Sequence, residues 1–115
     1  MFVGLARVVL QIPGARSLKD RRRVVKSLKD RLRARFPVSV AEVGDVEAWQ
    51  VATLGVAVVS GNRVRCDQVL SHVVDAARSS DAIIADFRTE VISFGSGGSG
   101  LRHGIESTFD DGTES

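Results

Sequence analysis

The chain has 115 residues, of which 43% are apolar and 26% charged, and its net charge at neutral pH is +2. This length accommodates one compact domain with one hydrophobic core and leaves no room for a second. The sequence contains neither a run of about 18 apolar residues nor a signal-peptide pattern, so the expected compartment is the cytoplasm, with no membrane contact. The single cysteine, Cys66, excludes an internal disulfide and a multi-cysteine metal site.

A strand and a long helix open the chain. Residues 2–12 are rich in Val, Leu and Ile and stop at Pro13-Gly14, which predicts a central strand followed by a turn. Ser17, with Asp20 three residues later, resembles a capping box at a helix N-terminus. The helix that it starts should extend to about Arg35.

A hairpin, a second helix and a last strand follow. Residues 38–44 and 51–59 are β-branched runs, so we expect an antiparallel hairpin with a long loop around Trp49. Residues 63–78 should form a helix, and residues 83–94 should form an edge strand with one wet face, with Ile83, Ala85, Phe87, Thr89 and Val91 on its apolar side. The apolar face of the second helix comprises Cys66, Val69, Leu70, Val73, Val74 and Ala77.

This order of elements predicts an α+β fold. Its usual solution is a ferredoxin-like βαββαβ sandwich: a four-stranded antiparallel sheet, in the order 4-1-3-2, with both helices on one face. The domain should span residues 1–94. The Gly/Ser-rich and acidic composition of residues 95–115 predicts a flexible tail outside the fold.

Two segments carry a resemblance to a known family. They are IPGARSLKDRRRVVKSLKDRLRARF, residues 12–36, and VSVAEVGDVEAWQVATLGVAVVS, residues 38–60. With both segments at the family's spacing, the chain resembles the YlxP-like family of small bacterial proteins over residues 2–94. The resemblance implies a ferredoxin-like fold, a bacterial origin and genes beside those for translation initiation and ribosome maturation factors. It implies no activity, because the family has no agreed biochemical function.

Positive charge is concentrated in the first helix. Residues 16–35 hold ten Lys or Arg and two Asp, a net +8, whereas the rest of the chain holds six bases and twelve acids, a net −6. At 100° per residue the apolar side chains gather on one side and six bases on the other, along about 21 Å of helix. Like charges three or four residues apart repel, so these bases do not stabilise the helix itself. We call them the basic stripe: Lys19, Arg22, Arg23, Lys26, Lys29 and Arg33, interrupted only by Asp30.

Three interpretations of the basic stripe are open: a site for RNA, a site for an acidic protein, or a solvated face with no ligand. RNA is favoured because each phosphate that is neutralised releases counterions, and six contacts to a single strand predict a log–log salt slope of about −4. Arg63 and Arg65, which oppose the dipole of the second helix, should lie near Arg33 and Arg35. The central strands lack the stacking aromatic residues of RNA-recognition motifs, so we do not expect base readout through the sheet.

Two smaller features also admit two interpretations. The turn with Gly14, Arg16 and Ser17 offers amides at a helix N-terminus that could hold an anion, or it is simply a turn and an N-cap. Arg21 falls within the apolar arc, so its stem should pack there while its guanidinium reaches Asp45 or Glu47, unless it is free for an external anion.

No set of side chains predicts an active site. Cys66 falls on the apolar face of its helix, His72 on the wet face and His103 in the tail, so they do not converge as metal binding or nucleophilic catalysis would require. There is no glycine-rich phosphate loop. We therefore expect no enzymatic activity, no metal and no cofactor.

The leading hypothesis is a non-catalytic accessory protein that binds RNA or a ribosomal particle through the phosphate backbone, using the basic stripe. The alternative is a homodimeric small-ligand-binding or assembly module of the regulatory ferredoxin-like type, with an effector near the first turn. A second copy would then cover the sheet face away from the helices, which carries Val3, Leu5 and Val9 or their neighbours of opposite parity.

Overall fold

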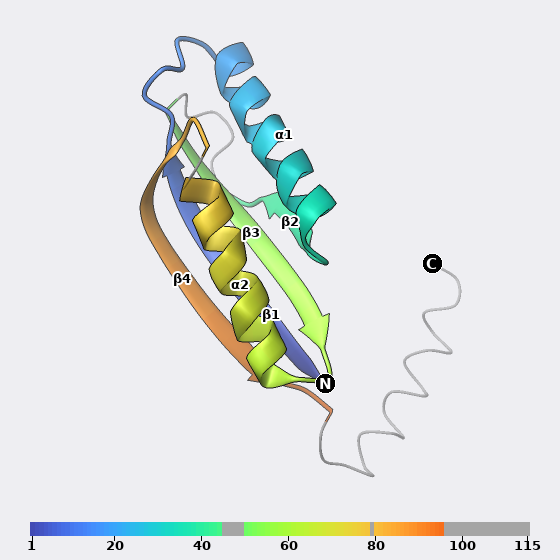
Figure 1. The fold of residues 1–115 in the computed structure, drawn as a ribbon. Helices are drawn as coiled ribbons and strands as arrows, with labels where there is room; N and C mark the ends of the chain where they lie inside the picture. Colours follow the sequence, from blue (N-terminus) through green and yellow to red (C-terminus); the bar gives the residue numbers. More distant parts are fainter. Residues whose placement is uncertain (45–49, 79, 96–115) are drawn as a thin grey trace, which may run out of the picture.

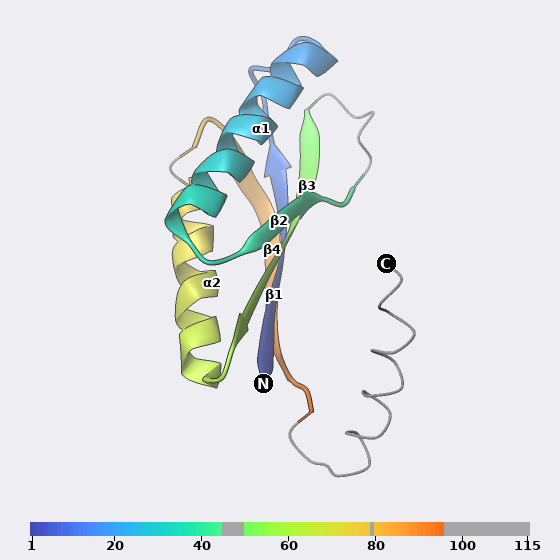
Figure 2. The ribbon, with the colours of Figure 1, turned by 90° about the vertical axis from the view of Figure 1, so that its right-hand side faces the viewer.

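A computed structural model of the chain describes residues 1–44, 50–78 and 80–95. The strands pair in one antiparallel sheet in the order β2-β3-β1-β4, and both helices cover the same face of it (Figures 1 and 2). The predicted ferredoxin-like βαββαβ fold and its strand order are therefore confirmed. The elements are β1 (Phe2–Gln11), α1 (Leu18–Arg35), β2 (Ser39–Glu42), β3 (Val51–Ser60), α2 (Arg63–Arg78) and β4 (Ile83–Ser93).

Two predicted features lie outside the described residues. One is the loop around Trp49, which includes Asp45 and Glu47. The other is the tail beyond residue 95, which includes His103. The expectations for both stay predictions.

The core lies between the helices and alternate residues of the two central strands. In β1 the inward side chains are Ala6, Val8 and Leu10, which leaves Leu5 and Arg7 on the open face. α2 packs closely on β1 at Gly4, where an added Cβ would lie 3.1 Å from Cδ1 of Leu70 and 3.2 Å from Cβ of Cys66. The predicted apolar face of α2 is confirmed, since all six of its residues are buried.

α1 begins and ends where the sequence predicts. Ser17 is the N-cap and accepts a hydrogen bond from the Asp20 amide at 3.2 Å, and the Phe36 amide closes the last turn on the Leu32 carbonyl. Val25, Leu28 and Leu32 are buried against the sheet, together with Arg21. This packing directs the opposite side of α1, with the basic stripe, away from the core.

β4 differs from the predicted alternation at its start. The pairing with β1 shifts between Val9 and Leu10, so that Asp86 faces Val9 while Ile84 faces Leu10. The extra residue, Ala85, reverses the parity of everything before it. Placing Ile83 on the apolar side was therefore wrong: Ile83 lies opposite Gln11 and is 55% exposed.

Candidate nucleic-acid interface

The basic stripe lies on the accessible side of α1. Five of its six side chains are exposed, and Lys29 is half-buried. Because the helix is regular from Leu18 to Arg35, these side chains follow one another along a single face rather than clustering at one point. A linear array of cations suits a linear polyanion better than a compact one.

One acid lies within the stripe and engages two of its members. Lys26 Nζ donates to Asp30 Oδ2 at 2.8 Å, and Arg33 Nη1 lies 3.6 Å from Asp30 Oδ1. The hydrogen bond from Lys26 lowers the pKa of the Asp30 carboxyl below its ordinary value, and the charges of Lys26, Arg33 and Lys29 act in the same direction. The side chains of Lys26, Asp30 and Arg33 are exposed, so these ion pairs are screened by solvent and can exchange for phosphate contacts.

Arg33 differs from the rest of the stripe because it also contacts the backbone. Its Nη2 donates to the carbonyl of Val40 in β2 at 2.6 Å. Four members have no ion pair with any residue in the described part of the chain. They are Lys19, Arg22, Arg23 and Lys29.

The C-terminal end of α1 lies beside the middle of α2. A hollow of about 420 Å³ separates them, lined by Arg35, Phe36, His72, Asp75 and Ala76. The Arg35 guanidinium sits over the Phe36 ring, 5.4 Å from its centroid. Sequence patterns do not predict this hollow, because it depends on how the two helices are placed against each other.

The expectation that Arg63 lies near Arg35 was wrong. Arg63 is at the foot of α2, where its guanidinium sits 5.4 Å from the centroid of the Phe2 ring. α1 stops short of this point, because the chain turns back into β2 opposite Ala57 while β3 continues to Ser60 (Figure 1). The start of α2 therefore does not extend the basic stripe.

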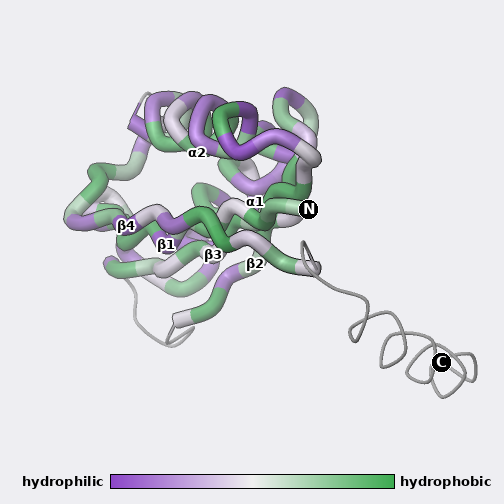
Figure 3. Tube along the Cα trace, turned by 90° about the horizontal axis from the view of Figure 1, so that it is seen from below, coloured by the Kyte–Doolittle hydropathy of each residue, from purple (hydrophilic) through white to green (hydrophobic). Residues whose placement is uncertain are grey.

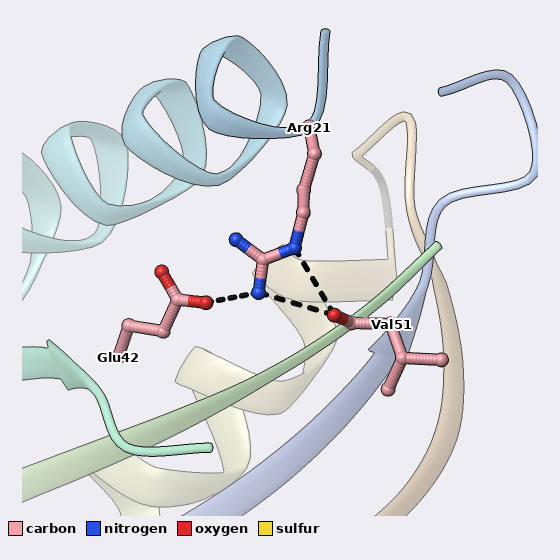
Figure 4. A network of polar contacts seen from close by, with 3 residues as sticks. All are labelled: Arg21, Glu42 and Val51. Carbon is pink, nitrogen blue, oxygen red and sulfur yellow. Dashed lines mark hydrogen bonds and ion pairs between the residues drawn. The ribbon is translucent and has the colours of Figure 1, made fainter. Parts of the chain in front are cut away.

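Arg21 is a structural residue rather than a member of the stripe. Its side chain is 1% exposed, and its guanidinium forms an ion pair with Glu42 and donates to the Val51 carbonyl from Nε at 3.2 Å and Nη2 at 3.1 Å (Figure 4). Burial of its stem is confirmed. Glu42 was missed, although its sequence position shows the signal: it shares the inward parity of Val40 on β2.

The turn before α1 is internally hydrogen-bonded. The Arg16 amide donates to Asp20 Oδ2 at 3.1 Å, while the Ser17 hydroxyl accepts from the Asp20 amide. A carboxylate of the chain itself therefore already occupies this helix N-terminus. The anion site at Gly14, Arg16 and Ser17 stays a prediction, and the Arg16 side chain there is exposed.

Neither metal chemistry nor a membrane span has a basis in the described ranges. Among residues 1–44, 50–78 and 80–95, no three His, Cys, Asp or Glu gather as metal ligands. No helix within these ranges combines the length and apolarity needed to cross a bilayer. Cys66 is fully buried, as its place on the apolar face of α2 predicts.

The comparisons identify a class of protein. The chain belongs to the family described as protein of unknown function (DUF503), whose model matches residues 3–89. It is 36% identical over 73 residues to the uncharacterized protein YlxP of Bacillus subtilis (strain 168), a match that covers 64% of this chain and 79% of that protein. The resemblance predicted from the two sequence segments is therefore confirmed.

Two solved structures of designed proteins are also similar to this chain. Ferredog-Diesel matches with a TM-score of 0.43 and 12% identity over 76% of this chain and 83% of its own. LFR1 1, designed with a ferredoxin fold, matches with a TM-score of 0.43 and 12% identity over 86% of this chain and 92% of its own.

Proposed function

We propose that this chain is a non-catalytic accessory protein that binds RNA in the cytoplasm, on a ribosomal particle, through the basic stripe. The observation that carries the proposal is the imbalance of charge on one exposed helix face. Six cations there meet a single acid, Asp30, and four of the six have no ion pair with a described residue. A phosphate backbone would neutralise them and release its counterions.

The second helix provides an internal comparison. Its exposed charged side chains are of both signs, with Arg63, Arg65 and Arg78 offset by Asp67 and Asp75. That mixture is what a solvated helix face ordinarily shows, because opposite charges near each other on a helix support it. α1 is built from the same chain in the same solvent, so its one-sided charge calls for an external partner.

The protein should contact the phosphate backbone of RNA rather than read its bases. The open face of the central strands presents Leu5, Arg7 and Val9 from β1 and small or β-branched side chains from β3. These side chains include no aromatic ring of the kind on which an RNA-recognition motif stacks its bases. Binding through Lys and Arg alone fixes position on an RNA and carries little sequence information.

The alternative, a homodimeric ligand-binding or assembly module, keeps partial support. The open face of β2 and β3 has an apolar hollow of about 250 Å³ beside Leu5, Val43 and Ala57, and Val43 is 58% exposed. This favours an assembly surface. The effector site near the first turn is less supported, because the polar groups of Arg16, Ser17 and Asp20 bond to one another there.

A double charge reversal tests the RNA proposal. Lys26→Glu with Lys29→Glu should abolish binding to ribosomal RNA in a fluorescence anisotropy titration, with the circular dichroism of the fold unchanged. The matched control is Arg63→Glu with Arg65→Glu, which changes the net charge equally at a helix N-terminus where acids are favourable. Equal binding by the stripe variant and the parent chain would refute the proposal.

A further inference from the structure

β4 is a long strand at the edge of the sheet that the described residues form. It spans 11 residues at the end of the sheet and pairs only with β1 among the described residues, at the left margin in Figure 1. Natural edge strands are usually short, covered, or protected by charged side chains, Pro or bulges. β4 has a bulge only near its start, at Ala85, and its charged side chains are Asp86, Arg88 and Glu90. Its apolar side chains Ile83, Phe87 and Ile92 are 55%, 43% and 40% exposed.

The register of β4 on β1 leaves a like-charge pair on the open face. Arg88 lies directly opposite Arg7, and Glu90 lies opposite Leu5. Like charges directly opposite in a sheet are destabilising. Arg7, Arg88 and Glu90 take part in no ion pair between described residues. An acidic side chain placed next to Arg88 from beyond the edge of the sheet would offset the repulsion between Arg88 and Arg7.

We propose that β4 pairs in antiparallel register with β4 of a second copy of this chain, about a two-fold axis through Thr89, to form one continuous sheet. An axis perpendicular to the sheet keeps the helices of both copies on the same side. Thr89 then faces the partner's Thr89. Arg88 faces the partner's Glu90 and Glu90 faces the partner's Arg88, while Phe87 and Val91 pair on the helix side. From Phe87 to Val91 each charged side chain and each apolar side chain finds a complement, whereas Asp86 faces the partner's Ile92.

The neighbouring registers are worse for identifiable reasons. An axis at Arg88 or at Glu90 would place like charges opposite each other across the seam. An axis at Phe87 would pair Asp86 with the partner's Arg88, but it would bring the irregularity at Ala85 into the new ladder. The Thr89 register uses only the regular stretch from Asp86 onward.

The same pairing borders a groove of mixed polarity. Between α2 and β4 a groove of about 270 Å³ is lined by Asp67, Leu70, Ser71, Val74, Asp75, Arg78, Phe87 and Thr89. Figure 3, viewed along the sheet, shows β4 at the margin with α2 above it. A second copy added at this margin would place its own Phe87 and Val91 beside the groove. The edge and the groove would then be buried together.

A charge swap tests both the assembly and its register. The full chain should sediment as a dimer, and Arg88→Glu or Glu90→Arg alone should raise the dissociation constant by about tenfold or more, because each creates two like-charge pairs. Combining the two substitutions restores opposite charges and should return the constant to near the parent value. A monomeric parent chain, or a double variant no better than either single one, would overturn the proposal.

Cysteine cross-linking gives a second readout that does not depend on affinity changes. Directly opposite residues of an antiparallel pair have Cα atoms about 4.5–5.5 Å apart, within the range of a disulfide. Thr89→Cys should therefore form a covalent dimer on oxidation, whereas Arg88→Cys should not. Cys66 is fully buried and does not compete. Cross-linking at Phe87→Cys instead of Thr89→Cys would refute the register.

Discussion

Replacing Asp30 with Asn should strengthen RNA binding, although it removes two ion pairs from the protein. Asp30 engages Lys26 and Arg33, and each must leave it to contact a phosphate. With these two occupied, four stripe cations have no ion pair with a described residue, which corresponds to a salt slope of about −3 on single-stranded RNA, from roughly −0.7 per contact. In Asp30→Asn all six are free of the acid, and the slope should steepen to about −4.

The assay is a fluorescence anisotropy titration of a ribosomal RNA fragment at several salt concentrations, with the parent chain and Asp30→Asn side by side. Asp20→Asn is the matched control, because Asp20 lies at the helix start, accepts from the Arg16 amide, and has no ion pair with a stripe residue in the described part of the chain. An affinity for Asp30→Asn that is equal to or weaker than that of the parent at low salt would show that the stripe does not carry the binding.

The pH dependence of RNA binding should agree with this role of Asp30. A carboxyl whose pKa is lowered in the folded state stays ionised down to that pKa, and its ion pairs are lost only as the pH falls through it. Asp30 therefore holds Lys26 and Arg33 at every pH above about 4. Lowering the pH from 7 to 5 should not reproduce the effect of Asp30→Asn, and a steepening of the salt slope over that interval would contradict the proposed role of Asp30.

Two predictions concern stability and are measured by urea unfolding. Glu42→Ala should cost about 3 kcal/mol, because it removes a carboxylate from the buried guanidinium of Arg21, and the double variant Arg21→Met with Glu42→Leu should recover most of that loss. A cost below about 1 kcal/mol for Glu42→Ala would mean that the pair is not held as described. Gly4→Ala should cost about 1–3 kcal/mol, since its Cβ would lie 2.9 Å from Val58 Cγ1 and 3.1 Å from Leu70 Cδ1; an unchanged midpoint would refute the close packing of α2 on β1.

Local patterns predicted the elements and the position of the stripe. Ser17 and Asp20 mark the start of α1 through side-chain hydrogen bonds that span only three or four residues, so they are visible in the sequence. The separation of Val25 and Leu28 from the charged residues follows from helical periodicity alone. These features depend on short-range geometry, which is why they were predictable.

Features that depend on long-range placement were not predictable in the same way. The irregularity at Ala85 depends on the pairing with β1, so alternation alone misplaced Ile83. The position of Arg63 depends on where α1 ends relative to α2, which the short β2 determines. The ion pair between Arg21 and Glu42 was only partly predictable. The alternation along β2 places Glu42 on the inward side, but the sequence did not distinguish it from the acids Asp45 and Glu47 of the following loop.

Co-sedimentation of the chain with ribosomal particles across a salt series tests the central claim most directly. The basic stripe predicts association at low salt that declines steeply as salt rises, with a slope of about −3 or steeper, and no association for the Lys26→Glu and Lys29→Glu double variant. Absence of association at the lowest salt, or association that salt does not weaken, would contradict the claim that this face binds a phosphate backbone.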